Sequence, residues 1–248
     1  MATRRDGRAP HELRPVTMQA GYAPFAEGSV LICAGSTRVL CAASVEDKVP
    51  RWLAGQGRGW VTAEYGLLPR STQVRVSRER SLSGGRTHEI QRLIGRSLRA
   101  VTDLQALGEL QITLDCDVLV ADGSTRTTAI TGAWVALALA CQHLRLKGLL
   151  ADWPLRGQVA AVSVGLVEGH PLLDLDYDED ARAEVDANLV MTGTGGLVEV
   201  QGTAERSPFS RRQLDLMLEL GAAGLARLFA LQRQTLQEAG VPLEWLEP

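Results

Sequence analysis

The sequence predicts a single α+β domain, and three observations support that prediction. Apolar runs of strand length occur in both halves of the chain and are separated by turns rich in Gly. Helical periodicity occurs at three places between and after these runs. The resulting order is hairpin, helix, strand, helix, four strands and helix, which is typical of α+β proteins, and no linker divides the chain. We therefore expect one domain over residues 1–248, with its core at about 15–240.

Composition places the chain among ordinary globular proteins of the cytoplasm. Apolar residues make up 45% of it and charged residues 22%. No apolar run reaches the length of a membrane span, and the first residues lack the hydrophobic segment of a signal peptide, so we expect no membrane partner. The four cysteines show no CxxC spacing and are expected to be reduced core residues. The absence of HExxH and GxSxG motifs gives no support to a zinc protease or a serine hydrolase.

The first quarter of the chain predicts a hairpin followed by a strand. Residues 1–14 are polar and rich in Arg, and we expect them to extend over the surface. The apolar runs at 29–34 and 39–44 flank the tetrapeptide Gly-Ser-Thr-Arg at 35–38, which is therefore expected to be a hairpin turn. Residues 60–68 have the composition of a further strand.

The segment from Arg70 to Arg99 concentrates positive charge. It contains eight arginines and two glutamates, although the whole chain has a formal net charge of −3. A polar loop opens the segment, and a helix is predicted from Arg86 because apolar residues recur at helical spacing from Ile90 to Leu98. Arginines without lysine favour bidentate phosphate contacts, so an RNA or phosphate track is predicted, with a solvated surface as the alternative. The arginines expected to contact RNA are Arg70, Arg75, Arg78, Arg80, Arg92, Arg96 and Arg99.

The centre of the chain predicts a strand, a tight turn and a buried helix. Cys116 to Ala121 is a Val-rich run of strand length. From Thr127 to Leu146 apolar residues cover most of the helix circumference, which indicates burial. The turn between them repeats Gly-Ser-Thr-Arg at 123–126, and Ser124 or Thr125 is expected to be the N-cap.

The second copy of this tetrapeptide is a candidate phosphate site. A helix start offers unpaired backbone N–H groups and a positive dipole end, and these four residues add two hydroxyls and a guanidinium. The copy at 35–38 has no helix behind it, and we interpret it as structural. For the second copy alone, the alternative is a capped helix with an exposed Arg.

The last third of the chain predicts four strands and a long helix. Ser210 and Gln213 form a capping box ahead of the helix, and Gly240 and Pro242 end it. The strands are expected at Gln158–Val167, Leu172–Tyr177, Val185–Thr192 and Leu197–Gly202.

The segment Leu173–Asn188 within this region is acidic. Its first part alternates apolar residues with Asp, which predicts a strand with one apolar and one acidic face. An EF-hand loop does not fit, because the glycine and the terminal glutamate that it needs are missing in both registers. Two functions remain open, carboxylates that hold Mg²⁺ and a carboxylate that acts as a general acid; the alternative to both is an acidic sheet edge.

An anion site, an Arg track and carboxylates together suit phosphoryl chemistry on a polyanion. The chain contains no P-loop and no kinase motif, so an ordinary NTPase is excluded.

Seven stretches of the chain carry a more specific signal than any single motif. They are RDGR…ELRPV (Arg5–Val16), GSVL…LCAASVE (Gly28–Glu46), GWVTAEYGLLPRST (Gly59–Thr72), GRTHEIQRLIGRSLR (Gly85–Arg99), LDCDVLVADGSTRTTAITGA (Leu114–Ala133), LDLDYDEDARAEVDAN (Leu173–Asn188) and VEVQGTAERSPFS (Val198–Ser210). In this order, and over nearly the whole chain, they resemble the ribonuclease PH family of bacterial phosphorolytic exoribonucleases, which trim tRNA 3′ ends.

The resemblance implies a fold of the ribosomal-protein-S5-domain-2 type and a homohexameric ring, a trimer of dimers. It implies inorganic phosphate as co-substrate, Mg²⁺ as cofactor and tRNA 3′ ends as the RNA partner. By family match, Asp180 and Asp186 are the catalytic and metal-holding carboxylates, whereas Asp174 and Asp176 match no family role. The residues implied to bind phosphate are Arg86, Ser124, Thr125 and Arg126, with Ser124 at a position where the family more typically has Gly.

The predicted function is therefore a phosphate-dependent 3′→5′ exoribonuclease that releases nucleoside 5′-diphosphates. One rival is a catalytically silent RNA-binding ring subunit, but such relatives typically lack the phosphate-binding Arg or the aspartates. Polynucleotide phosphorylase needs a second core and further RNA-binding domains, and a small-molecule phosphotransferase needs a nucleotide loop that the sequence does not show. We expect Asp180→Asn to abolish phosphorolysis and Asp174→Asn to be close to silent.

Overall fold

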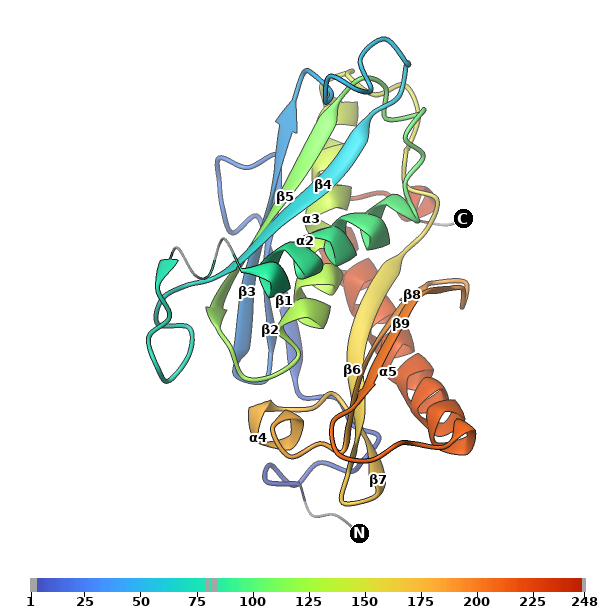
Figure 1. The fold of residues 1–248 in the computed structure, drawn as a ribbon. Coiled ribbons are helices and arrows are strands. Elements are labelled where there is room, and N and C mark those ends of the chain that lie inside the picture. Colours follow the sequence, from blue (N-terminus) through green and yellow to red (C-terminus); the bar gives the residue numbers. More distant parts are fainter. Residues whose placement is uncertain (1–3, 79–80, 82–83, 247–248) are drawn as a thin grey trace.

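The computed structural model describes residues 4–78, 81 and 84–246, and it contains two sheets with helices packed around them (Figure 1). The first sheet has the strand order β1-β2-β3-β5-β4, in which β4 and β5 run parallel and the other neighbours are antiparallel. A two-residue turn joins its second and third strands, and Gly35 there has φ +57°, so the hairpin predicted around the first Gly-Ser-Thr-Arg copy is confirmed. The bounds are β1 Val16–Ala20, β2 Gly28–Ala34, β3 Thr37–Glu46, β4 Trp60–Leu67 and β5 Gln111–Val120.

Two helices pack on one face of this sheet. Helix α2 (Gly85–Arg99) connects β4 to β5, because parallel neighbours need a crossover connection. Helix α3 (Thr125–Leu146) follows β5. Alternate residues of β3, such as Val39 and Cys41, are fully buried in the same cluster as the apolar residues of both helices, so this face of the sheet carries the larger core.

The second sheet is antiparallel throughout, with the order β7-β6-β8-β9. Helix α5 (Arg211–Glu238) packs against one face of it, and α3 contacts β6 from the other side. Every residue of β6 is therefore buried. The bounds are β6 Val159–Val167, β7 His170–Leu173, β8 Val185–Thr192 and β9 Leu197–Ala204; a short 3-10 helix, η1, covers Leu243–Trp245.

Helix α3 is thus the central element of the molecule, because both sheets pack against it. Its apolar character follows from this position: it is buried almost all round, as the sequence predicts. Among the described residues it is the one helix long and apolar enough to cross a membrane by length and composition, and 78% of its most apolar stretch is buried inside the protein. The α+β class is confirmed, as is the Ser210–Gln213 capping box that begins α5.

Two expectations about elements are wrong, and one strand was not predicted. The strand predicted over Leu172–Tyr177 ends at Leu173, because Asp174 adopts a left-handed φ of +54°. A single helical turn, α4 (Tyr177–Asp180), follows, and Asp176 caps it by accepting a hydrogen bond from the Glu179 N–H at 2.8 Å. The alternating Asp pattern therefore does not form an acidic strand face.

The second wrong expectation concerns residues 1–14, which do not simply extend over the surface. The side chains of Arg4 and Arg14 are buried, since each finds a buried carboxylate partner, Glu179 and Asp174 respectively. The strand that the sequence analysis did not predict is β1. Its residues alternate between half-buried and exposed positions at a sheet edge, so they carry a weak hydrophobic signal.

Candidate active site

A cleft of about 590 Å³ brings together four of the residues predicted to carry the chemistry. Arg86 stands at the start of α2 and Arg126 at the start of α3, whereas Asp180 ends α4 and Asp186 lies near the start of β8. Figure 1 shows α4 below the first turn of α3. Two guanidinium groups and two carboxylates from distant parts of the chain therefore line one cavity. The remaining lining residues are Glu89, Ala181, Ala183, Asn188, Gln201, Thr203, Glu205 and Arg206.

The positive side of the cleft is held in place by a glutamine that the sequence did not reveal. Arg126 donates from Nη1 to Oε1 of Gln201 at 2.8 Å, and Gln201 Nε2 donates to Oε1 of Glu89 at 2.8 Å. Arg86, at the N-terminal end of the same helix as Glu89, is exposed. Gln201 thus fixes the guanidinium of Arg126 through β9, an element of the other sheet.

The negative side of the cleft contains carboxylates in an environment that resists their ionisation. Burial raises the pKa of Asp186 to about 6, the charge of Asp180 acts in the same direction, and Arg126 and Arg86 act against it. The pKa of Asp180 is also raised, chiefly by burial. Solvent reaches part of the Asp180 side chain, but the surrounding protein atoms still limit the hydration of its carboxylate. The two aspartates therefore interact electrostatically within one cavity.

Strand register places the polar side chains of the second sheet on the cleft side. Asp186 pairs with Thr203 across β8 and β9, and Asn188 pairs with Gln201. All four line the cleft, while the intervening Ala187 is buried against α5. The alternation of a β-strand thus directs one face of this sheet toward chemistry and the other toward the core.

The carboxylates fit a magnesium ion better than a metal that needs many protein ligands. Within the described ranges there is no group of three or more His, Cys, Asp or Glu side chains suited to hold a metal. Mg²⁺ is usually bound through one or two carboxylates, with water and substrate phosphates completing its octahedron. Asp180 and Asp186 supply that number, and a cation between them would relieve the repulsion that raises the pKa of Asp186.

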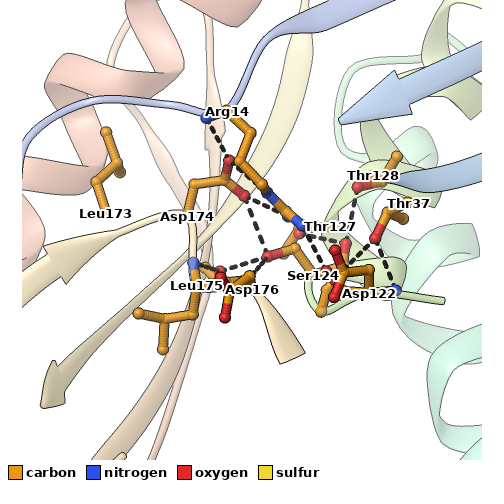
Figure 2. A network of polar contacts seen from close by, with 12 residues as sticks. Arg14, Thr37, Asp122, Ser124, Thr127, Thr128, Leu173, Asp174, Leu175 and Asp176 are labelled. Atoms are coloured by element: carbon orange, nitrogen blue, oxygen red, sulfur yellow. Dashed lines mark hydrogen bonds and ion pairs between the residues drawn. The ribbon is translucent and has the colours of Figure 1, made fainter. Parts of the chain in front are cut away.

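The turn before α3 uses its two hydroxyls differently from expectation. Ser124 occupies the N-cap position with φ +55°, but its side chain makes no capping hydrogen bond. Its Oγ lies 2.6 Å from Ser163 Oγ and 2.9 Å from the carbonyl oxygen of Leu175, in a network behind the turn (Figure 2). Neither Ser124 nor Thr125 lines the cleft, and Thr125 Oγ1 accepts a hydrogen bond from Tyr65 Oη at 2.8 Å. Ser124 can therefore offer a phosphate only its backbone N–H.

The predicted RNA-contacting arginines divide into two groups. Arg70, Arg75 and Arg78 are exposed on the loop before α2, and Arg92 and Arg96 are exposed on α2 itself. The second group is held within the fold or is not described. Arg99 stacks 4.3 Å from the centre of the Trp60 ring and donates to the Val61 carbonyl at 2.8 Å, so the structure does not bring it to the cleft. Arg80 lies outside the described residues.

One exposed arginine of α2 already has a partner in the same chain. Arg96 forms an ion pair with Glu199 of β9 at 2.5 Å. This pair links α2 to the second sheet on the same strand as Gln201. RNA binding at Arg96 would therefore compete with an internal salt bridge, whereas the arginines of the loop are presented to solvent.

The sequence missed Gln201, Asn188, Glu89, Glu205 and Arg206 as cleft residues. For the first two a signal existed, because polar residues at alternate positions of predicted strands mark one sheet face. Which face would meet the arginines was not predictable, since it depends on the packing of β8 and β9 against α3.

Comparison with known proteins finds matches over most of the chain. Residues 12–141 match domain 1 of the 3′ exoribonuclease family, and residues 157–224 match domain 2. The chain is 58% identical over 231 residues to ribonuclease PH of Methylobacterium radiotolerans, an alignment that covers 92% of this chain and 98% of the relative. It is 59% identical over 228 residues to ribonuclease PH of Methylocella silvestris, which covers 91% and 96% respectively.

Solved structures with the same architecture come from more distant proteins. The crystal structure of rice (Oryza sativa) Rrp46 superposes with a TM-score of 0.76 at 24% identity, covering 94% of this chain and all of that chain. The Archaeoglobus fulgidus exosome with RNA bound to the active site gives a TM-score of 0.76 at 20% identity, covering 91% of both chains. At these identities the structures establish the fold.

Proposed function

The chain belongs to the 3′ exoribonuclease family and has the fold of its ribonuclease PH members, and from this premise we propose how its cleft works. The protein is a phosphorolytic 3′→5′ exoribonuclease that trims the 3′ end of tRNA. Inorganic phosphate attacks the last phosphodiester, the bond to the 3′ oxygen of the preceding nucleotide breaks, and a nucleoside 5′-diphosphate leaves. The preceding 3′ oxygen takes up a proton and becomes the new chain end.

The observation that carries this proposal is the single cleft lined by Arg86 and Arg126 on one side and Asp180 and Asp186 on the other. Attack of a phosphate anion on an RNA phosphodiester brings like charges together, so preorganised positive charge must offset their repulsion. Arg86 and Arg126 would hold the attacking phosphate, assisted by backbone N–H groups at the start of α3. The guanidinium of Arg126 is already fixed by Gln201 before any substrate arrives.

The carboxylates have a separate role at the leaving group. A group whose pKa lies near neutrality can hold a proton and release it to a departing oxygen, and Asp186 meets that requirement. Asp180 and Asp186 would alternatively hold Mg²⁺, which when bound supplies positive charge to the phosphoryl oxygens. Asn188 and Thr203 beside Asp186 can donate or accept hydrogen bonds to the same substrate.

The remaining partners follow from the exposed charge and the family. We propose that Arg70, Arg75 and Arg78 contact the RNA backbone, because they are exposed on one loop ahead of Arg86. A homohexamer built as a trimer of dimers, located in the cytoplasm, is proposed from family membership alone.

The test compares tRNA with a 3′ extension in the presence and absence of phosphate, with Mg²⁺ present throughout. We expect trimming only when phosphate is added, with nucleoside diphosphates as products. Release of monophosphates without phosphate would show a hydrolase and overturn the proposal.

The same assay distinguishes the enzyme from its rival, a catalytically silent RNA-binding ring subunit. That rival predicts RNA binding without any phosphate-dependent product. Asp180→Asn is the matched variant: we expect it to bind tRNA as the wild type does, because the exposed arginines are unchanged, but to release no diphosphate.

A further inference from the structure

The turn at the start of α3, residues 123–126, is called the phosphate turn below. A buried polar network lies behind it and contains none of the residues that line the cleft. At its centre is Asp174, which is 4% exposed. Its Oδ2 accepts hydrogen bonds from Nε and the backbone N–H of Arg14 at 3.0 and 2.8 Å, and its Oδ1 accepts one from Arg14 Nη2 at 2.7 Å (Figure 2). A buried ion pair is not by itself a source of stability, because desolvation offsets much of its attraction. The role of the Arg14–Asp174 pair is therefore sought in the groups that it contacts, and not in the strength of the ion pair.

The first connection of this pair is to the turn before α3. Oγ of Ser124 lies 3.2 Å from Oδ1 of Asp174. Ser163 Oγ accepts the N–H of Leu175 at 3.0 Å, so it can donate its own proton to Ser124, whose proton then goes to Asp174 or to the Leu175 carbonyl. Arg14 also donates from Nη1 to the carbonyl of Asp122, the residue that precedes Gly123.

This support matters because the turn has an unfavourable backbone conformation. Ser124 has φ +55°, a left-handed value that residues other than Gly adopt only when the surroundings stabilise it. The hydroxyl of Thr37 holds the same turn from the other side: it donates to the Gly123 carbonyl at 2.8 Å and accepts the Asp122 N–H at 3.0 Å. Thr37 belongs to the first Gly-Ser-Thr-Arg copy, so the structural copy supports the functional one.

The second connection is to the helical turn that carries Asp180. A Cβ added to Gly123 would lie 2.5 Å from the Leu175 carbonyl oxygen and 2.6 Å from the carbonyl carbon of Asp176. The phosphate turn is therefore packed directly on the backbone that caps α4, and Asp180 ends α4. Residues that fix this contact determine where Arg126 stands relative to Asp180.

We propose that Asp174 and Arg14 are positioning residues for the attacking phosphate. They act through Ser124 and Asp122, and they hold the turn in the one conformation that places Arg126 and the first amides of α3 at the cleft. This inference rests on the proposed phosphate site, and it predicts a measurable effect of Asp174→Asn where the sequence alone predicts almost none. Asp174 is not catalytic, since it does not line the cleft.

The chain contains a matched control on the same N-terminal segment. Arg4 donates from Nε and Nη2 to the two carboxylate oxygens of Glu179 at 2.8 and 2.7 Å, and both side chains are buried. Glu179 also accepts the Asp176 N–H at 3.1 Å and thereby completes the cap of α4. This pair is as deeply buried as the first. Arg4 Nη2 also donates to the Asp174 carbonyl oxygen at 3.0 Å, but the Glu179 carboxylate contacts the cap of α4 and so supports the carboxylate side of the cleft.

The experiment compares Asp174→Asn with Glu179→Gln in the full-length protein. We measure the KM for inorganic phosphate, the KM for tRNA and kcat, together with the rise in Tm that inorganic phosphate produces. Asp174→Asn is expected to raise the phosphate KM by about tenfold or more, because small displacements of a binding group have effects of this size. It should reduce the phosphate-induced rise in Tm and leave the tRNA KM unchanged. Glu179→Gln is expected to lower kcat while the phosphate KM stays within about twofold of wild type.

If Asp174 contributed to stability alone, Asp174→Asn would lower the active fraction and the Tm but leave the phosphate KM as close to the wild-type value as Glu179→Gln does, and that result would overturn the inference. Should Asp174→Asn fail to fold, Arg14→Lys decides the matter. It keeps a positive charge beside Asp174 but cannot also reach the Asp122 carbonyl, so the phosphate KM should rise by about threefold or more; an unchanged value contradicts the inference. Failure of the proposed function itself is visible in the wild type as absent diphosphate release. The phosphate-induced change in Tm still compares the variants in that case, because it requires no turnover.

Discussion

Asp186 has the most strongly altered environment of the cleft carboxylates, and this has a consequence for stability. Its pKa of about 6 in the folded protein exceeds its ordinary value of 3.8, so folding favours the protonated form. The contribution of this residue to stability is fully present below about pH 4 and is lost as pH rises through about 6. A neutral side chain in its place avoids that loss.

We therefore expect Asp186→Asn to stabilise the protein at pH 8 without phosphate or Mg²⁺. The shift corresponds to a limit of about 3 kcal/mol, and solvent screening reduces the expected gain to roughly 1–2 kcal/mol. Urea unfolding at pH 8 and pH 4 measures it, and the gain should disappear at pH 4. The exposed Asp152→Asn serves as the control. An equal change in the free energy of unfolding at both pH values would contradict the raised pKa of Asp186.

Arg126 gives the second prediction at the level of residues. Arg126→Ala removes a charge-assisted contact to a bound dianion, so it should cost about 2–4 kcal/mol of transition-state stabilisation, roughly 30- to 1000-fold in rate at subsaturating phosphate. Gln201→Leu leaves the guanidinium but removes its hydrogen-bond acceptor, and a smaller loss of about 1 kcal/mol is expected. Equal losses in the two variants would show that Gln201 has a role other than holding Arg126.

At the scale of elements, the phosphate turn depends on its first residue. Gly123 has φ +75° and its Cα faces the backbone of Leu175 and Asp176, so Gly123→Ala combines backbone strain with a clash. Gly21 has φ +71° and open space around it, so Gly21→Ala isolates the strain, about 1–2 kcal/mol. We expect Gly123→Ala to lower stability by more than Gly21→Ala and to abolish phosphorolysis. Thermal unfolding and diphosphate release measure both, and full activity of Gly123→Ala would refute the packing of the turn on α4.

Elements with strong periodicity were predictable from the sequence, and those governed by long-range pairing were not. The hairpin β2–β3, helices α2, α3 and α5 and strand β8 lie where the patterns place them. The stretch after Leu173 was misread because Asp alternation resembles a strand, whereas buried pairing with Arg14 fixes Asp174 in a left-handed conformation. Arginines at 4 and 14 looked like surface residues for the same reason: their partners are more than 150 residues away.

The candidate site likewise contains residues that could be predicted from the sequence and residues that could not. Arg126 could be named from its place at a helix start, and the family resemblance implied Arg86, Asp180 and Asp186. The structure gathers all four in one cleft. Gln201 lies on a recognisably polar strand face, but its contact with Arg126 could not be predicted, since it arises from the approach of β9 to the start of α3. The direction of the Ser124 hydroxyl was equally unpredictable, because it depends on Ser163 and Leu175 from the second sheet.

At the scale of the whole molecule, we expect the chain to assemble as a ring of six copies. Sedimentation velocity at micromolar concentration should show a hexamer, and activity on tRNA should fall as dilution dissociates it, because binding one extended RNA benefits from several copies of the loop arginines. A monomer with full activity on tRNA would contradict this expectation.

The central claim is that the cleft directs inorganic phosphate, and not water, onto the end of an RNA chain. The most direct test supplies ³²P-labelled inorganic phosphate with unlabelled 3′-extended tRNA and Mg²⁺ and follows the label. Phosphorolysis predicts that the label appears in the terminal phosphate of the released nucleoside diphosphates, and that Arg126→Ala and Asp180→Asn abolish or strongly reduce its incorporation. Shortened tRNA with no label in the released nucleotides would contradict the account.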